Sequence, residues 1–231
     1  MFYKDWEPIY KKISREFNYT YEREKNSAEI LNNLLNDKQL FPIKQLEKII
    51  INKEIVIFGA GPSLENSIEK YKKKIINFVK ITADGATSAL LKKNILPDII
   101  VTDFDGYMPD QIKANLNGCI VIIHAHGDNI SSIKKYVKEF KKNIIGTTHI
   151  DPSSFENIYN FGGFTDGDRA VFLSSHFKAK KINLIGFDFD GKIGMFSYPE
   201  KKDLNMKLKK LFWCNKLIKE LIDHKENIIF L

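Results

Sequence analysis

From residue 54 onward, short runs of β-branched and other apolar residues alternate with amphipathic stretches. Strands that are apolar throughout, with helices between them, are typical of a parallel sheet that is covered on both faces. We therefore predict an α/β fold for residues 51–231, with a doubly wound, mostly parallel sheet and helices on both faces. The expected strands lie within 54–63, 78–87, 98–106, 119–129, 143–151, 181–191 and 227–231, and the expected helices within 64–75, 86–94, 130–142, 167–179 and 204–224.

The first 50 residues follow a different pattern. Apolar residues recur at helical spacing within 6–17 and 27–50, and Pro42 divides the second stretch. We predict a small N-terminal helical segment at 1–50, which is either a cap or a dimerisation element, so that a homo-oligomer is one alternative. A loop at about 192–202 has the character of a lid.

Composition excludes several classes of function. A chain of 231 residues can bury a full core as one such domain. The net charge of +7 comes mostly from lysines on helix-like stretches, and no basic run is interleaved with aromatic residues, so we expect no nucleic-acid partner. No window is apolar enough to cross a bilayer. The two cysteines form neither a metal-type spacing nor a disulfide framework, so a cytoplasmic protein is expected.

Acidic residues follow the expected strands. In open α/β sheets, ligands bind beyond the carboxyl ends of the strands. Asp103 and Asp105 lie two positions apart in an extended segment, so they project to the same side. Together with Asp84, which ends the preceding strand, they could hold one or two Mg²⁺ ions through oxygen ligands. The alternative is structural, because Asp84 could cap a helix and Asp105 could begin a turn with Gly106.

Two glycine-rich turns suggest phosphate binding. The amides of the turn that contains Gly59, Gly61 and Ser63 could cradle a phosphate at a helix N-terminus. A tight strand-to-helix turn also needs glycine for backbone reasons alone. In the second turn, at 162–170, Asp166 could hold a metal or a hydroxyl group while Arg169 clamps phosphate oxygens, or the acids could simply cap a helix.

The segment "HAHGDN" at 124–129 resembles the HxHxDH metal motif of metallo-β-lactamase-fold hydrolases. Asn129 stands where that motif has its final histidine. A zinc site would also leave the other acid-tipped strands without a task. His126 and Asp128 are therefore expected at the edge of the sheet, and His124 within it.

The spacing of three segments resembles that of a known family. "ADGATSALLKKNILPDIIVTDFDG" at 83–106 is followed by "FTDGDRA" at 164–170 and "INLIGFDFDG" at 182–191. This spacing is similar to the catalytic half of thiamine pyrophosphokinases. It resembles more closely the archaeal 6-hydroxymethyl-7,8-dihydropterin pyrophosphokinases, in which the "GAGPS" turn precedes it. The likeness covers about residues 54–191. The thiamine enzymes carry a further β-rich domain after this half, whereas a lid-like loop, one long helix and a short strand are expected after Asp190 here, so thiamine is disfavoured as a substrate.

The resemblance implies Mg²⁺-dependent transfer of a pyrophosphoryl group from ATP to the hydroxymethyl group of a reduced pterin. The products would be AMP and the pterin diphosphate, in tetrahydromethanopterin biosynthesis. The expected metal ligands are Asp103 and Asp105, with Asp84 or Asp166 completing the shell or orienting the hydroxyl. The remaining expected roles are phosphate binding by Arg169 and the turn at Gly59, Gly61 and Ser63; a proton acceptor or phosphate contact at His126 and Asp128; and hydrogen bonds from the pterin edge to Asp188 and Asp190.

Three other functions fit parts of the sequence. A glycosyltransferase could use the same scaffold and would release the base-bearing portion of a sugar nucleotide instead of AMP. A catalytically silent protein could hold a nucleotide and metal without turnover. A Rossmann methyltransferase would use the glycine turn, but it would give the later acids no task.

Overall fold

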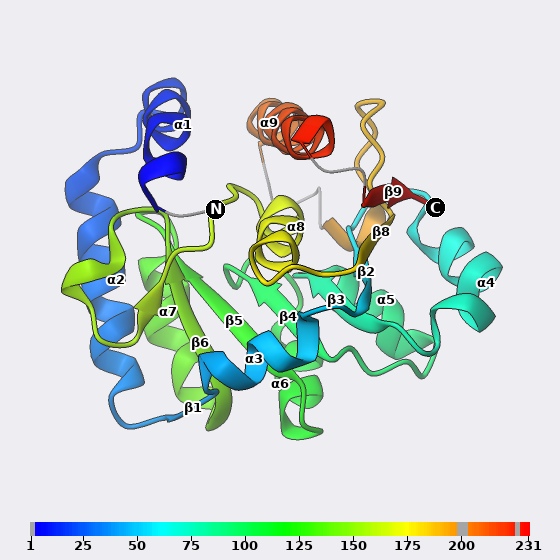
Figure 1. The fold of residues 1–231 in the computed structure, drawn as a ribbon. Helices are drawn as coiled ribbons and strands as arrows, with labels where there is room; N and C mark the ends of the chain where they lie inside the picture. The colour runs from blue at the N-terminus through cyan, green and yellow to red at the C-terminus, as the bar shows by residue number, and fades with distance from the viewer. Residues whose placement is uncertain (1–2, 198–202, 225–226) are drawn as a thin grey trace.

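The computed structural model describes residues 3–197, 203–224 and 227–231, and it confirms the α/β fold (Figure 1). Every strand pairing in these residues is parallel. The strands are β1 (Gln39–Leu40), β2 (Glu54–Phe58), β3 (Val79–Ala83), β4 (Ile99–Thr102), β5 (Ile120–Ala125), β6 (Lys142–Thr148), β7 (Ile158–Tyr159), β8 (Lys181–Ile185) and β9 (Ile228–Phe230). All seven predicted strands are present, whereas the two-residue strands β1 and β7 were not predicted.

The strand order reverses at one position in the sheet. The order is β1-β6-β5-β4-β3-β2-β8-β9, and β7 also pairs with β6. From β2 the chain steps through β3, β4 and β5 to β6, and it then returns to place β8 on the other side of β2. Such a reversal opens a crevice at the carboxyl ends of the two strands, which is where ligands bind in folds of this type.

Helices cover both faces of the sheet. They are α1 (Tyr3–Glu16), α2 (Tyr21–Leu35), α3 (Ile43–Ile50), α4 (Leu64–Ile75), α5 (Ala86–Lys92), α6 (Met108–Leu116), α7 (Ile130–Tyr136), α8 (Asp166–His176) and α9 (Leu204–His224). Side chains of α1, α3, α8 and α9 share one core with the sheet. Those of α2, α6 and α7, and those of α4 and α5, form two clusters on the other face. Both faces are therefore buried, as doubly wound folds require.

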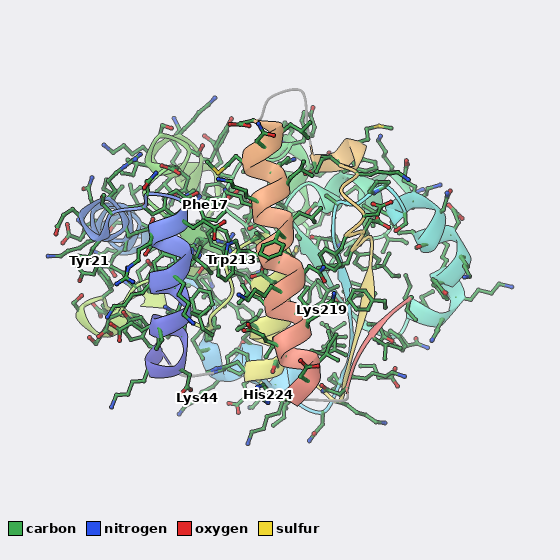
Figure 2. The ribbon with its side chains drawn as sticks, turned by 90° about the horizontal axis from the view of Figure 1, so that it is seen from above. Phe17, Tyr21, Lys44, Trp213, Lys219 and His224 are labelled. Atoms are coloured by element: carbon green, nitrogen blue, oxygen red, sulfur yellow. The ribbon has the colours of Figure 1, made fainter. Side chains whose placement is uncertain are left out.

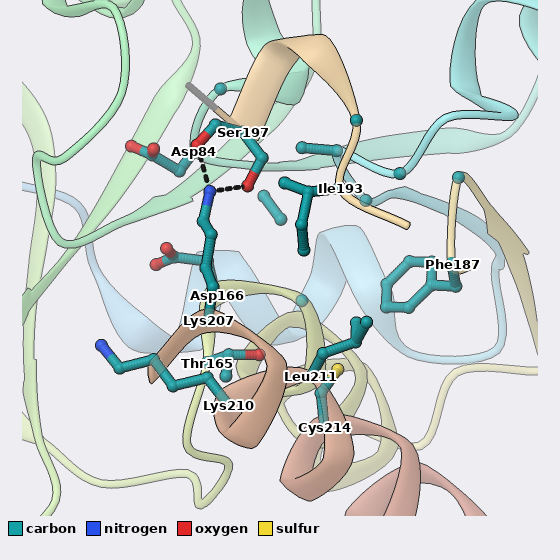
Figure 3. A pocket seen from close by; sticks show the side chains of 18 of the residues that line it. Asp84, Thr165, Asp166, Phe187, Ile193, Ser197, Lys207, Lys210, Leu211 and Cys214 are labelled. Carbon is teal, nitrogen blue, oxygen red and sulfur yellow. Dashed lines mark hydrogen bonds between the residues drawn. The ribbon is translucent and has the colours of Figure 1, made fainter. Parts of the chain in front are cut away.

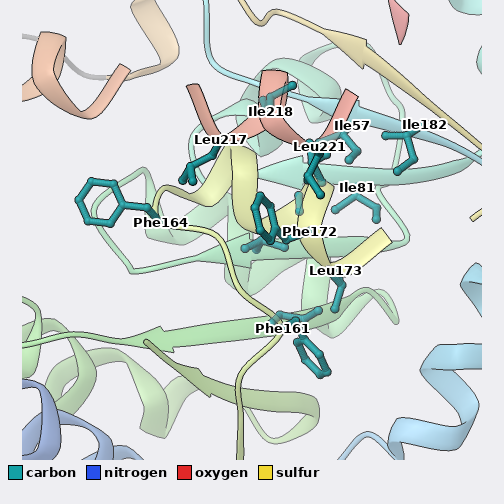
Figure 4. Close-up of a cluster of buried hydrophobic side chains, with 14 of the residues drawn as sticks. Ile57, Ile81, Phe161, Phe164, Phe172, Leu173, Ile182, Leu217, Ile218 and Leu221 are labelled. Carbon is teal, nitrogen blue, oxygen red and sulfur yellow. The ribbon is translucent and has the colours of Figure 1, made fainter. Parts of the chain in front are cut away.

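The largest cluster joins α8 and α9 to the sheet (Figure 4). Phe172 of α8 packs edge-on against Trp6 of α1, with 5.9 Å between the ring centroids, and Leu173 lies beside Val101 and Ile122 of the sheet. Leu217 and Leu221 of α9 close this layer from above. Seen from above, α1 and α9 run side by side over this layer (Figure 2). Trp213 Nε1 of α9 donates a hydrogen bond to Glu16 Oε2 of α1 at 2.8 Å. Helix α9 is thereby fixed above the sheet.

The N-terminal helices contribute to the same core as the sheet. Trp6 is fully buried, and its Nε1 donates to the His149 carbonyl at 3.1 Å. After α2, strand β1 pairs with β6. The division at residue 50 remains a prediction, and so does the lid, of which residues 198–202 lie outside the described residues. None of the helices described here is long and apolar enough to cross a membrane.

Candidate active site

Asp84 is held in place by the neighbouring strand and by α6. It follows β3 with a φ of 42°, and its Oδ1 accepts hydrogen bonds from Thr102 Oγ1 and Gln111 Nε2, each at 2.7 Å. Thr102 Oγ1 also accepts a bond from the Phe104 amide at 2.9 Å, which fixes the turn after β4. One carboxylate oxygen of Asp84 is therefore anchored to the scaffold.

Three carboxylates from different elements converge beside that anchor. One oxygen each of Asp84, Asp103 and Asp166 lies within 4.8 Å of the other two. Burial is the main cause that raises the pKa of Asp84 well above its usual value, and nearby carboxylates add to it. Burial likewise raises the pKa of Asp166 to about 8, with a further contribution from Asp103. Oxygen ligands that repel one another in this way are suited to a divalent cation.

Asp105 adjoins this group of acids. It raises the pKa of Asp84 both through its charge and through a hydrogen bond between the two carboxyl groups. A Cβ atom at Gly106 would lie only 2.4 Å from Asp84 Oδ2, so glycine is required there for the two segments to approach. The predicted pair Asp103 and Asp105 thus lies beside Asp84.

His126 orients Asp103. Its Nε2 lies 3.3 Å from Asp103 Oδ2, and its Nδ1 accepts a hydrogen bond from the Asp128 amide at 3.3 Å. Because Nδ1 is the acceptor, Nε2 carries the proton toward the carboxylate. Burial opposes ionisation of Asp103, but the His126 hydrogen bond and the charges of Arg169 and Lys210 lower its pKa below the usual value.

Asn129 has a structural role in the segment that resembles a zinc motif. Its Nδ2 donates to the carbonyls of Asp103 at 2.9 Å and His124 at 2.7 Å, and its Oδ1 accepts from the His126 amide at 3.0 Å. His124 Nδ1 is bonded to Thr147 Oγ1 at 3.1 Å. Asn129 therefore joins β4 to β5 and sets the direction of His126.

Helix α8 presents Asp166 and Arg169 at its N-terminus. A capping box defines this end: the Thr165 side chain accepts from the Asp168 amide, and the Thr165 amide donates to Asp168 Oδ1 at 3.1 Å. Thr165 Oγ1 also donates to Asp168 Oδ2 at 2.7 Å. Arg169 is buried, and its Nη2 bonds directly to Asp166 Oδ1. The isolated arginine is thus bound to an acid of the cluster.

A cavity of about 190 Å³ opens above these acids, between the strand ends and α9 (Figure 3). Of the predicted site residues, the following line it: Gly59, Gly61, Asp84, Asp103, Asp105, His126, Asp166, Arg169 and Asp188. Residues that follow strands β2, β3, β4, β5 and β8 therefore meet residues of α8 in one cavity.

Three predicted residues have other partners. Ser63 does not line the cavity, and its amide and Oγ both donate to Asp188 Oδ2 at 2.9 Å. Asp128 binds Arg23 Nη2 at 2.9 Å, on the side of α2. The side chain of Asp190 is 56% exposed and pairs with Lys192 at 3.3 Å. The structure does not bring these three to the lining of the cavity.

Several lining residues were not predicted from the sequence. Lys207, Lys210, Leu211 and Cys214 approach from α9, and Tyr19, His149 and Phe164 form an aromatic wall. The four α9 residues follow the i, i+3, i+4, i+7 spacing of one helix face. That spacing could have predicted that the four residues share one face of the helix. It could not have predicted that this face lies over the strand ends.

The sequence model of the family described as "6-hydroxymethylpterin diphosphokinase MptE-like" matches residues 25–194. The chain belongs to this family. Three relatives of this MptE-like chain bear the name 6-hydroxymethyl-7,8-dihydropterin pyrophosphokinase. The one from Methanocaldococcus jannaschii is 44% identical over 96% of this chain and 97% of its own length. That from Pyrococcus furiosus is 40% identical over 96% and 94%. The third, from Methanothermobacter thermautotrophicus, is 39% identical over 84% and 82%.

Among solved structures, the MAf glycosyltransferase from Magnetospirillum magneticum AMB-1 aligns with 74% of the MptE-like chain and 28% of its own. The TM-score is 0.41 and the sequence identity 15%.

Proposed function

We propose that this MptE-like protein transfers a pyrophosphoryl group from ATP to the hydroxymethyl group of 6-hydroxymethyl-7,8-dihydropterin. The names of the three relatives, which match this chain over most of their length, support the reaction. The observation that links this reaction to particular residues is the convergence of Asp84, Asp103 and Asp166 at the floor of the cavity.

In the proposed step, the hydroxymethyl oxygen forms a bond to the β-phosphorus of ATP. The bond from that phosphorus to the oxygen it shares with the α-phosphorus breaks, and AMP leaves with the electron pair. Catalysis of this kind depends on positioning and on neutralising the phosphates, with little covalent work for the protein. Mg²⁺, held by Asp103, Asp105 and Asp84, would supply that neutralisation.

The chain's own groups then have defined tasks. Asp166 orients the attacking hydroxyl and receives its proton as the bond to phosphorus forms. His126 keeps Asp103 in position through the contact at 3.3 Å. Asp188 is the one of the two predicted pterin-binding carboxylates that lines the cavity, and its Oδ1 accepts from the amino-pyrimidinone edge.

The test is to incubate the protein with ATP, Mg²⁺ and the hydroxymethyl-dihydropterin and to separate the nucleotides by chromatography. We expect AMP and the pterin diphosphate in equal amounts, and neither product when Mg²⁺ is chelated or in Asp103→Asn. Formation of ADP would identify a different phosphoryl transfer. ATP binding without turnover would leave only a nucleotide-binding protein.

A further inference from the structure

Two lysines of α9 extend into the cavity that the acids line. Lys207 and Lys210 are both half-buried and line the cavity with Leu211 and Cys214, on one face of the helix (Figure 3). The Lys207 ammonium donates to the Ser197 carbonyl and hydroxyl, and it lies on the same side of the cavity as Asp84 and Asp166. The charge of Lys210 acts on Asp103, since it contributes to the lowered pKa of that carboxyl group.

The glycine turn after β2 is unavailable to phosphates. The N-terminus of α4, which follows this turn, already binds a carboxylate, because Asp188 Oδ2 accepts hydrogen bonds from the Ser63 amide and hydroxyl. A Cβ atom at Gly61 would lie only 2.3 Å from the same oxygen. A phosphate placed there would meet a fixed negative charge at contact distance. The phosphates of a nucleotide must therefore be bound by other groups.

Two other basic side chains of the lining already pair with acids. Arg169 bonds to Asp166, and Lys192 pairs with the exposed Asp190. Lys210, by contrast, forms no ion pair with any residue that the structure describes. Five carboxyl groups line the cavity, so a bound polyphosphate needs cations beyond the metal ion.

We propose that Lys207 and Lys210, which reach into the cavity from α9, bind the polyphosphate of the donor nucleotide. A lysine is suited to this task because its ammonium is a mobile point charge with three donors. The identity of the donor as a nucleoside triphosphate rests on the proposed function, whereas the polyphosphate site can be tested separately.

The experiment compares Lys207→Met and Lys210→Met with Lys209→Met, an exposed lysine of the same helix. Methionine keeps an aliphatic stem against the cavity wall. Dissociation constants are measured by calorimetry, with Mg²⁺ and without pterin, for ATP, ADP, AMP, adenosine and inorganic tripolyphosphate. We expect each of the first two changes to weaken ATP and tripolyphosphate binding by about 10-fold or more. The effect should shrink with each phosphate removed and vanish for adenosine.

Equal affinity for tripolyphosphate in all three variants would overturn the proposal. A loss that is as large for adenosine as for ATP would also overturn it, because the lysines would then only shape the cavity. Loss of tripolyphosphate affinity without any AMP formation by the unmodified protein would retain the lysine site and reject the reaction. AMP formation by the unmodified protein, with unchanged tripolyphosphate affinity in the lysine variants, would support the reaction and reject the lysine site.

A second, smaller cavity of about 20 Å³ lies behind Arg169. Three of its lining residues each carry a buried polar atom that has no hydrogen-bond partner among the described residues: His124 Nε2, Thr148 Oγ1 and Arg169 Nε. Thr147 Oγ1 donates to the Ile123 carbonyl at 3.0 Å, so it must accept from His124 Nδ1–H. Nε2 of the neutral His124 ring is therefore an acceptor.

We infer that one water molecule occupies this cavity. It accepts from Arg169 Nε–H, donates to His124 Nε2 and shares its third bond with Thr148. The volume is enough for one water, and three bonds are typical of buried waters. This water holds the guanidinium group from behind while Asp166 holds it from the front.

A crystal structure at a resolution that reveals ordered waters tests this inference. We expect a water within about 3.2 Å of all three atoms, and ¹⁵N chemical shifts that show the proton of His124 on Nδ1. A dry cavity, or a direct bond from Arg169 to His124, would refute it. A proton on His124 Nε2 at neutral pH would also refute the inference.

Discussion

Asp84 combines an unusual backbone with a fixed side chain. Its positive φ is a conformation that residues other than glycine rarely adopt, although aspartate does so more readily than most. Hydrogen bonds from Thr102 and Gln111 hold one oxygen, and the carboxylate lies close to Asp103 and Asp166. The strain of the turn thus places a carboxylate where its charge is costly, and a cation relieves that cost.

Asp105 separates the catalytic interpretation from the structural one. If it binds the catalytic metal, Asp105→Asn should lower kcat on the order of 10²-fold or more, because such charge stabilisation is worth several kcal/mol. Steady-state AMP formation measures the effect, and Asp223→Asn at the exposed end of α9 is the control. An unchanged kcat and an unchanged free energy of unfolding in Asp105→Asn would show that Asp105 has only a structural role in the turn.

His149 makes the protein sensitive to acid. It is buried between Tyr10 and Phe164 and faces Glu24 Oε2 at 3.6 Å. Burial lowers its pKa to about 4, although Glu24 opposes the shift. The unfolded chain takes up this proton near pH 6.5 and the folded protein only near pH 4, so the free energy of unfolding falls as pH is lowered through that window.

We therefore expect urea unfolding at pH 5 to show lower stability than at pH 7, by up to about 1.4 kcal/mol per pH unit for this one proton. The double variant Glu24→Gln, His149→Phe should flatten this dependence, whereas His224→Asn at the surface should not. An unchanged slope in the double variant would assign the acid sensitivity to other groups.

At the scale of elements, the N-terminus of α8 joins stability to the site. Thr165→Ala removes the hydroxyl that bonds to Asp168, and it should lower the free energy of unfolding by about 1 kcal/mol. Thr165→Ser keeps the hydroxyl and should restore most of the loss. Denaturant titration of the three proteins checks this, and equal midpoints would show that the cap contributes nothing.

The elements that the sequence predicted are those with uninterrupted periodicity. Helices α4 and α9 begin and end at the predicted residues, 64–75 and 204–224. Helix α6 was not predicted because its buried face carries Gln111 and Asn115. Both are polar: Gln111 binds Asp84, 27 positions away, and Asn115 binds the carbonyls of nearby Cys119 and of Lys142. Gln111, which positions Asp84, is thus also one of the residues that interrupt the apolar pattern of α6.

The acids of the site were predictable because the carboxyl ends of parallel strands meet at one edge. The lysines were not, since the position of α9 above that edge depends on packing against α8 and α1. Ser63 and Asp188 were both selected from the sequence, but nothing in the sequence indicates that they bind each other. Contacts between distant segments decide such roles.

At the scale of the whole molecule, the two tryptophans test whether the N-terminal segment unfolds with the sheet. Trp6 of α1 is fully buried, and Trp213 of α9 is nearly so. The variants Trp6→Phe and Trp213→Phe each leave one fluorescent reporter. Within each variant, we expect fluorescence and circular dichroism to give the same denaturant midpoint, because α1 and α9 share one core. An earlier fluorescence transition for Trp6 alone would indicate a separate unit.

The strand order also constrains when this sheet can be completed. Strand β2 is the first long strand to be synthesised, yet its neighbour β8 lies far downstream, and Asn183 bonds to the Ile55 carbonyl 128 positions away. On the ribosome, one edge of β2 stays unpaired until most of the chain has emerged. Contacts so distant in sequence slow folding and leave an edge open to other chains. Slower elongation before residue 181 would prolong that exposure, so the yield of native protein should depend on translation speed there.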